Sequence, residues 1–147
     1  MHRFTNKQGI ELIKSFEGLR TEPYVCAGGY LTIGYGHRLL PSDSYKKISP
    51  EKAVQILAND LCKVERSVLK YINAEINDDQ FAALVSFTFN VGAAALQRSV
   101  LRQKINYGHY DDGAKEFLKW VYAGGRKITG LVRRRRLESE LFSGIVG

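Results

Sequence analysis

Cysteine, proline and long apolar runs are scarce in this chain of 147 residues. It has two cysteines and three prolines. Two cysteines do not make the disulfide framework of a small secreted domain, and no apolar run is long enough for a transmembrane helix. The N-terminal residues lack the apolar core of a secretion signal. We therefore expect the chain to fold in a reducing cytoplasm.

Acidic residues are also in short supply, 15 against 22 lysines and arginines, so the net charge is +7 and the pI is about 9.5. Such a balance favours polyanions, whether nucleic acid, an anionic membrane or an acidic cell wall. Charge alone does not separate these partners. The content of hydrophobic residues, 44%, is that of a globular chain, and the length fits one domain with a real core.

One acidic residue ends a short amphipathic segment near the N-terminus. Ile10, Ile13 and Glu17 are spaced to share one face of a helix, and Gly18 is a typical helix C-cap. Glu17 would then lie, partly desolvated, at the negative end of a helix. Both effects favour the protonated form that a general acid needs near neutral pH. The alternative is an ordinary exposed glutamate at a helix end.

A β-hairpin is predicted directly after this segment. Gly28–Gly29 lies between two short stretches rich in aromatic and β-branched residues, which is a turn signal. In the second stretch, Leu31 and Ile33 alternate with Thr32. If the aliphatic side chains pack inward, Thr32 points outward on the polar face. Cys26 lies across the turn. Taken alone, Cys26 is also explained as a small buried hydrophobe and Thr32 as a strand former.

The spacing of these residues, Glu17-x8-Cys26-x5-Thr32, continues into the run Thr-Ile-Gly-Tyr-Gly-His. It resembles the active-site segment of the bacteriophage-type lysozymes (endolysins), a family that uses Glu, then Asp or Cys, then Thr at this spacing. Later segments resemble the same family in the same order: Phe89–Gly92, Trp120–Gly125 and Gly130–Arg135. The resemblance therefore covers nearly the whole chain.

The resemblance implies hydrolysis of the β-1,4 bond between N-acetylmuramic acid and N-acetylglucosamine in peptidoglycan, with inversion at the anomeric carbon. Glu17 would protonate the leaving oxygen. A water held by Thr32 and the group at Cys26 would attack from the far side. Paired carboxylates usually share this work, and here cysteine replaces the second one. A thiolate could act as base or nucleophile, whereas a neutral thiol could only orient water.

Peptidoglycan is thus the expected partner, with no nucleic acid, no stable membrane insertion, no cofactor and no metal. We expect a monomer in the host cytoplasm that acts on the cell wall after release, for which the family resemblance implies a holin. Two alternatives stay open. A lytic transglycosylase would use Glu17 alone and leave 1,6-anhydro ends. A non-enzymatic basic module would bind nucleic acid or a phage structural component. The presence of Cys26 and Thr32 favours hydrolysis over a transglycosylase reaction. The position of Glu17 on an apolar face argues against a basic binding module.

The fold implied is α+β and mostly helical, a two-lobed lysozyme-like fold in a single domain, 1–147. A β-rich lobe of about 18–48 is joined by a long helix of about 50–71 to a helical lobe of about 72–147, which includes the N-terminal helix. Ser49 and Pro50 are a strong start for the long helix. Its apolar stripe has alternating spacings of three and four: Val54, Leu57, Leu61, Val64 and Val68.

A buried helix is expected next, capped by Asn77 or Asp78, because apolar residues surround it on most sides. Its part Ser86–Asn90 could also form a strand, although the longer pattern favours helix. Further helices are predicted at about 93–105, 111–122 and 131–143.

Four consecutive arginines, Arg133–Arg136, suggest nucleic-acid binding. On a helix, however, consecutive residues turn by about 100° and cannot form one patch. Arg134 falls near the middle of the inward apolar face, while Arg136 points away. An arginine that points inward is costly unless a carboxylate pairs with it. We predict that Arg134 pairs with Glu17 and holds it in place. Such a pair opposes protonation of Glu17. The alternative is a solvated basic face.

The resemblance assigns supporting roles to four more residues. His37 is expected to be structural and to pair with Asp60 on the long helix. Phe89, Asn90 and Ser99 match positions near the substrate cleft, although Phe89 is equally explained as core and Ser99 as a helix cap. The remaining acidic candidates are expected to be ordinary surface charges: Asp43, Glu51 and Glu65. Cys62 lies off the apolar stripe and has no assigned role.

Overall fold

The computed structural model describes residues 2–145. Its elements in chain order are α1 (Lys7–Glu17), β1 (Arg20–Val25), β2 (Leu31–Gly34), β3 (His37–Arg38), α2 (Pro50–Tyr71), α3 (Asp78–Val91), α4 (Ala93–Arg98), α5 (Val100–Asn106), α6 (Tyr110–Glu116), the 3-10 turn η1 (Phe117–Lys119), β4 (Tyr122–Ala123), β5 (Arg126–Lys127) and α7 (Thr129–Ser143). The predicted fold class, α+β and mostly helical, is confirmed.

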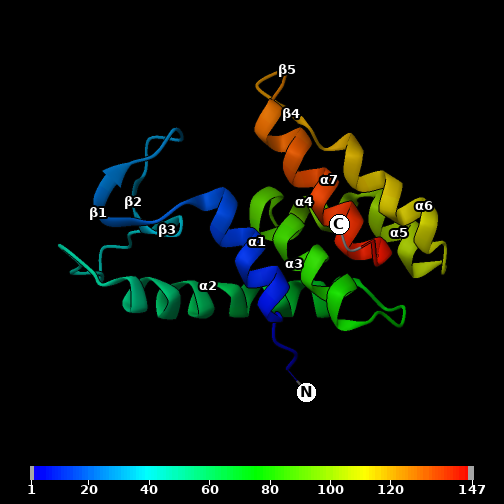
Figure 1. Ribbon diagram of the computed structural model, residues 1–147, viewed down its shortest axis with the longest axis horizontal. Coiled ribbons are helices and arrows are strands. Elements are labelled where there is room, and N and C mark those ends of the chain that lie inside the picture. Colours follow the sequence, from blue (N-terminus) through cyan, green and yellow to red (C-terminus); the bar gives the residue numbers. More distant parts are fainter. Residues whose placement is uncertain (1, 146–147) are drawn as a thin grey trace.

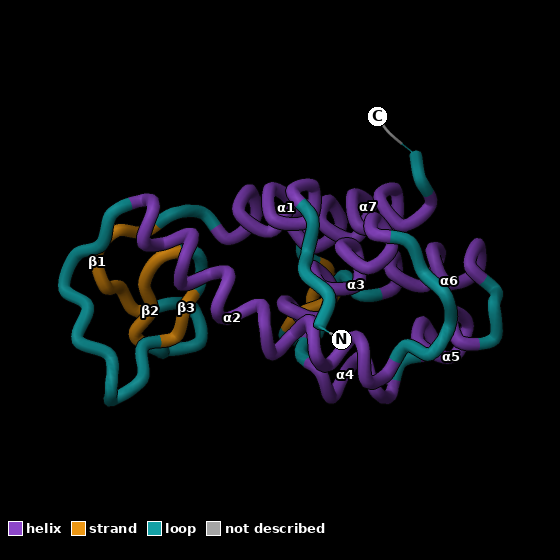
Figure 2. The backbone as a smooth tube through the Cα atoms, turned by 90° about the horizontal axis from the view of Figure 1, so that it is seen from below, coloured by secondary structure: helices purple, strands orange, loops and turns teal. Residues whose placement is uncertain are grey.

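The long helix α2 organises the molecule. The antiparallel sheet β1-β2-β3 lies at one end of α2, and helices α3 to α7 gather at the other end (Figures 1 and 2). Helix α1 runs between these two parts and leads directly into β1 (Figure 1). The C-terminus of α1, which carries Glu17, therefore faces the junction of the sheet and the helices.

Local signals in the sequence explain where these helices begin and end. Ser49 accepts a hydrogen bond from the Lys52 N–H at 3.0 Å, and Pro50 occupies the first turn of α2, as predicted. Helix α1 stops at Gly18, whose φ is +71° and whose N–H donates to the Lys14 carbonyl. Asn77 caps α3 in a reciprocal arrangement with Gln80.

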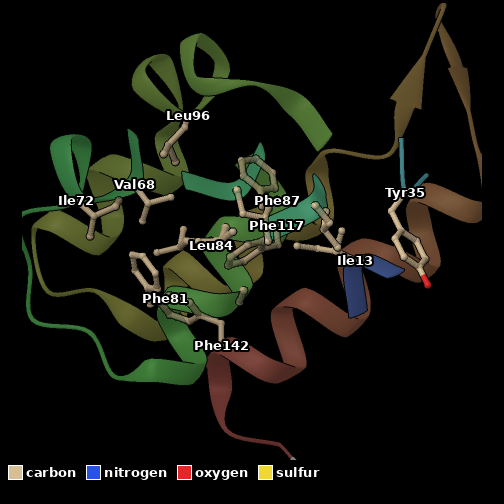
Figure 3. Packing of buried hydrophobic residues seen from close by; sticks show 14 of the residues in the cluster. Ile13, Tyr35, Val68, Ile72, Phe81, Leu84, Phe87, Leu96, Phe117 and Phe142 are labelled. Carbon is tan, nitrogen blue, oxygen red and sulfur yellow. The ribbon is translucent and has the colours of Figure 1, made fainter. Parts of the chain in front are cut away.

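The hydrophobic core is centred on α3, which is buried without interruption from Phe81 to Thr88. Figure 3 shows the aromatic rings of Phe87, Phe117 and Phe142 packed with this helix. The segment Ser86–Asn90 is helical, which decides between the two predicted conformations. Because α3 is surrounded by other elements, polar groups on its neighbours must find partners inside the protein.

Several sequence predictions about the elements were wrong. The helix expected at about 93–105 is broken at Ser99, because that side chain starts a new helix, α5. The helix expected at about 111–122 ends at Glu116, and a short hairpin, β4–β5, follows it. On α2, Val54 is 38% exposed, while the buried face includes Ala53 and Ile56. Among residues 2–145, no helix combines the length and apolarity needed to cross a membrane.

Candidate active site

Glu17 is held by an arginine from the opposite end of the chain. The Nη1 of Arg134 on α7 donates to Oε2 of Glu17 at 2.9 Å, as the sequence predicted. The Arg134 side chain is only 4% exposed, whereas that of Glu17 is 22% exposed. Arg136 is exposed, also as predicted. The carboxylate is therefore oriented from inside the protein and still reachable from outside.

Arg134 is itself fixed by a buried network. Its Nε donates to Oε2 of Glu138 at 3.2 Å, and its Nη2 donates to the Ser86 carbonyl at 3.1 Å. The Ser86 hydroxyl donates to the same Glu138 oxygen at 2.6 Å. Arg135 donates to the other oxygen of Glu138 and to the Trp120 carbonyl. Burial raises the pKa of Glu138, and the two guanidiniums oppose that shift.

The second oxygen of Glu17 lies against a glycine in the turn between β2 and β3. Gly36 has φ of +81°, and a Cβ built on it would lie 2.8 Å from Oε1 of Glu17. A glycine is needed there for two reasons, because the backbone is left-handed and because the carboxylate occupies the space of a side chain. The turn after β2 thus brings the sheet into contact with the end of α1.

Cys26 and Thr32 are brought together by a shared backbone acceptor. The Cys26 N–H and the Thr32 hydroxyl both donate to the Tyr30 carbonyl, each at 2.9 Å. This arrangement places the thiol and the hydroxyl next to each other across the hairpin. Neither side chain is hydrogen-bonded to Glu17 in the part of the chain that the structure describes.

The predicted orientation of Thr32 was wrong. Thr32 is 4% exposed, whereas Leu31 is 50% exposed. Thr32 lies in the central strand, and its antiparallel partners Tyr24 and Arg38 flank it with large side chains. Leu31 pairs with Val25 at the tip of the hairpin, which extends away from the helices (Figure 1).

The environment of the Cys26 thiol lowers its pKa below the ordinary value of 9.0. The main cause is a hydrogen bond with the Thr32 side chain, followed by the backbone of Tyr30 and Gly28. A hydrogen bond to the thiolate stabilises its negative charge. Among the groups around the thiol, Thr32 therefore contributes most to the lowered pKa of Cys26.

His37 pairs with Asp60, as expected, but it has a second acidic partner. Its Nδ1 is 2.8 Å from Oδ2 of Asp60, the predicted partner on α2. Its Nε2 is 3.1 Å from Oδ2 of Asp43, which also accepts the Leu40 N–H at 2.7 Å. Asp43 is therefore not the ordinary surface charge we expected. Burial disfavours the charge on His37, yet the two carboxylates together raise its pKa above 6.5.

The three predicted cleft residues differ in their surroundings. Asn90 is exposed, and its Oδ1 accepts a hydrogen bond from Arg135. It lines a cavity of about 380 Å³ together with Trp120 and Tyr122. Phe89 is half-buried and packs against the core.

Ser99 is 3% exposed and caps a helix. Its hydroxyl donates to the Leu96 carbonyl at 2.8 Å and accepts from the Arg102 N–H at 3.0 Å. Ser99 is therefore a helix cap, which is one of the two roles considered for it from the sequence.

Two further acidic predictions have opposite outcomes. Glu51 is exposed in the first turn of α2, as expected of a surface charge. Glu65 is 3% exposed, so the surface prediction was wrong for it. Its Oε2 accepts both the backbone N–H and the hydroxyl of Thr5, at 2.7 Å each. The N-terminal segment covers this carboxylate and supplies its partners.

Sequence reasoning missed the network behind Arg134, namely Glu138, Arg135 and Ser86. One signal could have found part of it, because Arg134 and Glu138 are spaced i, i+4 and so lie on the same face of the helix. The role of Gly36 had no comparable signal, since its contact with Glu17 exists only after α1 and the sheet come together.

Comparison with known proteins points to one family. A family model described as "Phage lysozyme" matches residues 14–138. The endolysin of Bacillus phage B103 is 45% identical over 139 residues, which are 93% of this chain and 53% of that protein. This chain thus spans about half the length of that relative. The endolysin of Acyrthosiphon pisum secondary endosymbiont phage 1 is 36% identical, with 93% of this chain and 96% of that protein covered.

A solved structure agrees over nearly the whole length. The endolysin from the Escherichia coli phage FAHEc1 superposes with a TM-score of 0.88 and 33% sequence identity. The superposition covers 99% of this chain and 97% of that one.

Proposed function

Because the chain belongs to the phage lysozyme family, we propose that it is an endolysin that hydrolyses the β-1,4 bond between N-acetylmuramic acid and N-acetylglucosamine in peptidoglycan. In this proposal residues 1–147 form one catalytic domain, with a β-rich lobe, the connecting helix and a helical lobe. The observation that supports it most is the environment of Glu17. A partly exposed carboxylate is fixed through one oxygen by a buried arginine.

Glu17 is the proposed general acid. Its Oε2 accepts a hydrogen bond from Arg134, so the transferable proton resides on Oε1, beside Gly36. From there the proton passes to the glycosidic oxygen as the bond to the anomeric carbon breaks. A carboxyl group with one oxygen anchored keeps its other oxygen in a fixed direction, which favours proton transfer.

Cys26 and Thr32 are proposed to hold the attacking water on the far face of the sugar. Cysteine would occupy the position where the family uses Asp or Cys. The hydroxyl next to the thiol lowers the pKa of Cys26, which increases the thiolate fraction available to accept a proton from the water. The absence of a direct hydrogen bond from Glu17 to Cys26, among residues 2–145, suits an inverting site, where a water must fit between the two groups.

The surroundings of the site support two positioning roles and one contact with substrate. Arg134 holds Glu17, and the pair of His37 with Asp60 ties the sheet to α2. Asn90 lies at the rim of the cavity near Trp120, where a sugar or peptide could reach its amide. We further propose that the protein acts as a monomer, accumulates in the host cytoplasm and reaches the wall with the help of a holin.

The test uses Glu17→Gln, which keeps the size and the hydrogen bond to Arg134 but cannot donate an acidic proton. We expect the rate of clearing of chloroform-treated Gram-negative cells to fall by about 10²–10⁴-fold. Glu11→Gln is the matched control, because Glu11 is exposed on the same helix and, among residues 2–145, pairs only with Lys14, at 3.5 Å. Thermal unfolding of both variants separates lost chemistry from lost folding.

Mass spectrometry of the digested wall distinguishes the reaction types. Hydrolysis yields reducing N-acetylmuramic acid ends, whereas a lytic transglycosylase yields 1,6-anhydro ends. Anhydro products, or a Glu17→Gln variant as active as Glu11→Gln, would contradict the proposal. Steep salt-dependent DNA binding without any wall lysis would support a basic binding module instead.

A further inference from the structure

We propose that His2, Cys62 and Glu65 form a binding site for a thiophilic divalent cation of the zinc class. One ligand atom from each residue lies within 4.8 Å of the other two. Cys62 and Glu65 are three positions apart on α2, and so face the same side of that helix. His2 reaches them from the N-terminal segment before α1. The site lies outside the residues assigned to catalysis and does not depend on the proposed function.

The set of ligands suits zinc rather than a hard cation. Zinc binds imidazole nitrogen, cysteine thiolate and carboxylate oxygen in tetrahedral sites, whereas magnesium and calcium require oxygen ligands. Tetrahedral bonds of about 2.0–2.3 Å place ligand atoms roughly 3.3–3.8 Å apart. The atoms here need to move by about 1 Å or less, which side-chain rotation allows. A water would complete the fourth position.

The burial of Glu65 is the reason to expect a cation. Its side chain is 4% exposed, and no lysine or arginine pairs with it among residues 2–145; its Oε1 lies 2.8 Å from Nε2 of His2. Hydrogen bonds from Thr5 offset part of the cost of burying this carboxylate, and a positive charge would offset more of it. A divalent cation supplies that charge, and with one thiolate and one carboxylate the site becomes neutral.

The carboxylate is already oriented as a metal ligand. Oε2 is occupied by the N–H and the hydroxyl of Thr5, so Oε1, which now contacts Nε2 of His2, is the oxygen that would bind the ion. Ligating carboxylates are commonly fixed by hydrogen bonds of this kind. When the cation binds, the Cys62 thiol loses its proton, and its weak 3.5 Å contact with the Ala58 carbonyl is given up. The His2 nitrogen binds in its neutral form.

Such a site would fasten the N-terminal segment to the middle of α2.

The test uses the full chain without a polyhistidine tag, with zinc and cobalt as probes. We expect one zinc per chain by calorimetry. The melting temperature should rise by about 5–10 °C at free zinc a hundredfold above Kd, and the rise should be reversed by EDTA. Cobalt should give thiolate-to-metal charge-transfer absorption.

Cys62→Ser and His2→Gln should each weaken zinc binding by at least about tenfold, and Cys62→Ser should abolish the cobalt absorption. Matched controls are Cys26→Ser and His109→Gln, which remove the other cysteine and an exposed histidine. Both should bind zinc as the unmodified protein does. An unchanged melting temperature with zinc, or zinc binding that survives Cys62→Ser, would overturn the site. Loss of the cobalt absorption in Cys26→Ser would also overturn it, because the ion would then be bound at Cys26.

Discussion

Gly36→Ala tests whether the position of Glu17 depends on the turn between β2 and β3. The substitution introduces two separate effects. Alanine at φ of +81° strains the backbone, and its Cβ would lie 2.8 Å from Oε1 of Glu17. Gly108→Ala is the matched control, since Gly108 also has φ of +81° but a methyl group added there would meet nothing within 4 Å.

The two effects have different magnitudes and different consequences. A non-glycine residue in the left-handed region costs about 1–3 kcal/mol, so both variants should lose a similar amount of stability, roughly 3–10 °C in Tm. Only Gly36→Ala displaces the carboxylate, by about 0.5 Å or more to restore an ordinary carbon–oxygen contact. Oε2 is fixed by Arg134, so this movement lengthens their 2.9 Å hydrogen bond. Because a displacement of about 1 Å costs about 10²-fold in rate, we expect about tenfold here.

The assay measures both quantities for each variant. Wall-clearing rates are taken well below the Tm of either protein and are compared at equal concentrations of folded enzyme. The reasoning predicts matched losses of stability and a tenfold difference in activity. If the two variants clear cell walls at the same rate, the contact of Gly36 with Glu17 has no bearing on activity.

Three other predictions follow from the buried and half-buried charges. Glu138→Gln removes the carboxylate between two buried arginines, and we expect denaturant unfolding to show a loss of about 3–5 kcal/mol; a loss below about 1 kcal/mol would contradict this. His37 has a raised pKa, so its contribution to the free energy of unfolding is complete below pH 6.5 and disappears as the pH rises through the folded-state pKa. Asp60→Asn should therefore lower the free energy of unfolding more at about pH 6 than at about pH 9. Thr32→Val removes the main cause of the lowered pKa of Cys26. In a protein that lacks Cys62, iodoacetamide should therefore alkylate Cys26 more slowly near pH 7 when Thr32 is replaced. An unchanged rate of alkylation would show that Thr32 does not lower this pKa.

Much of the fold was predictable because its signals are local. A capping serine with a following proline marks the start of α2, and a glycine marks the end of α1. A pair of glycines marks the hairpin. Predictions were wrong where a local pattern had two solutions, as at Ser99, where an apolar stretch continues but the side chain begins a new helix.

The prediction that Glu17 and Arg134 pair came from the sequence through a physical argument, since an arginine on an apolar helix face requires a buried carboxylate. The same argument could not identify the rest of the network, because Ser86 and Trp120 accept hydrogen bonds through backbone carbonyls that any residue carries, and the hydroxyl of Ser86 meets Glu138 only in the folded protein. Nor could it foresee that Thr32 is buried, since the alternation of a strand defines two faces but does not say what covers each one.

The sequence by itself indicated the family, the mostly helical α+β class and the pairing of Glu17 with Arg134, because these depend on residue types and spacings along the chain. Tertiary structure decided which oxygen of Glu17 is anchored, which acids are buried, and that His2 lies beside Cys62 and Glu65. These features depend on distances between segments more than 60 positions apart, and such distances arise only when the packing of α1, α2 and α7 brings the segments together.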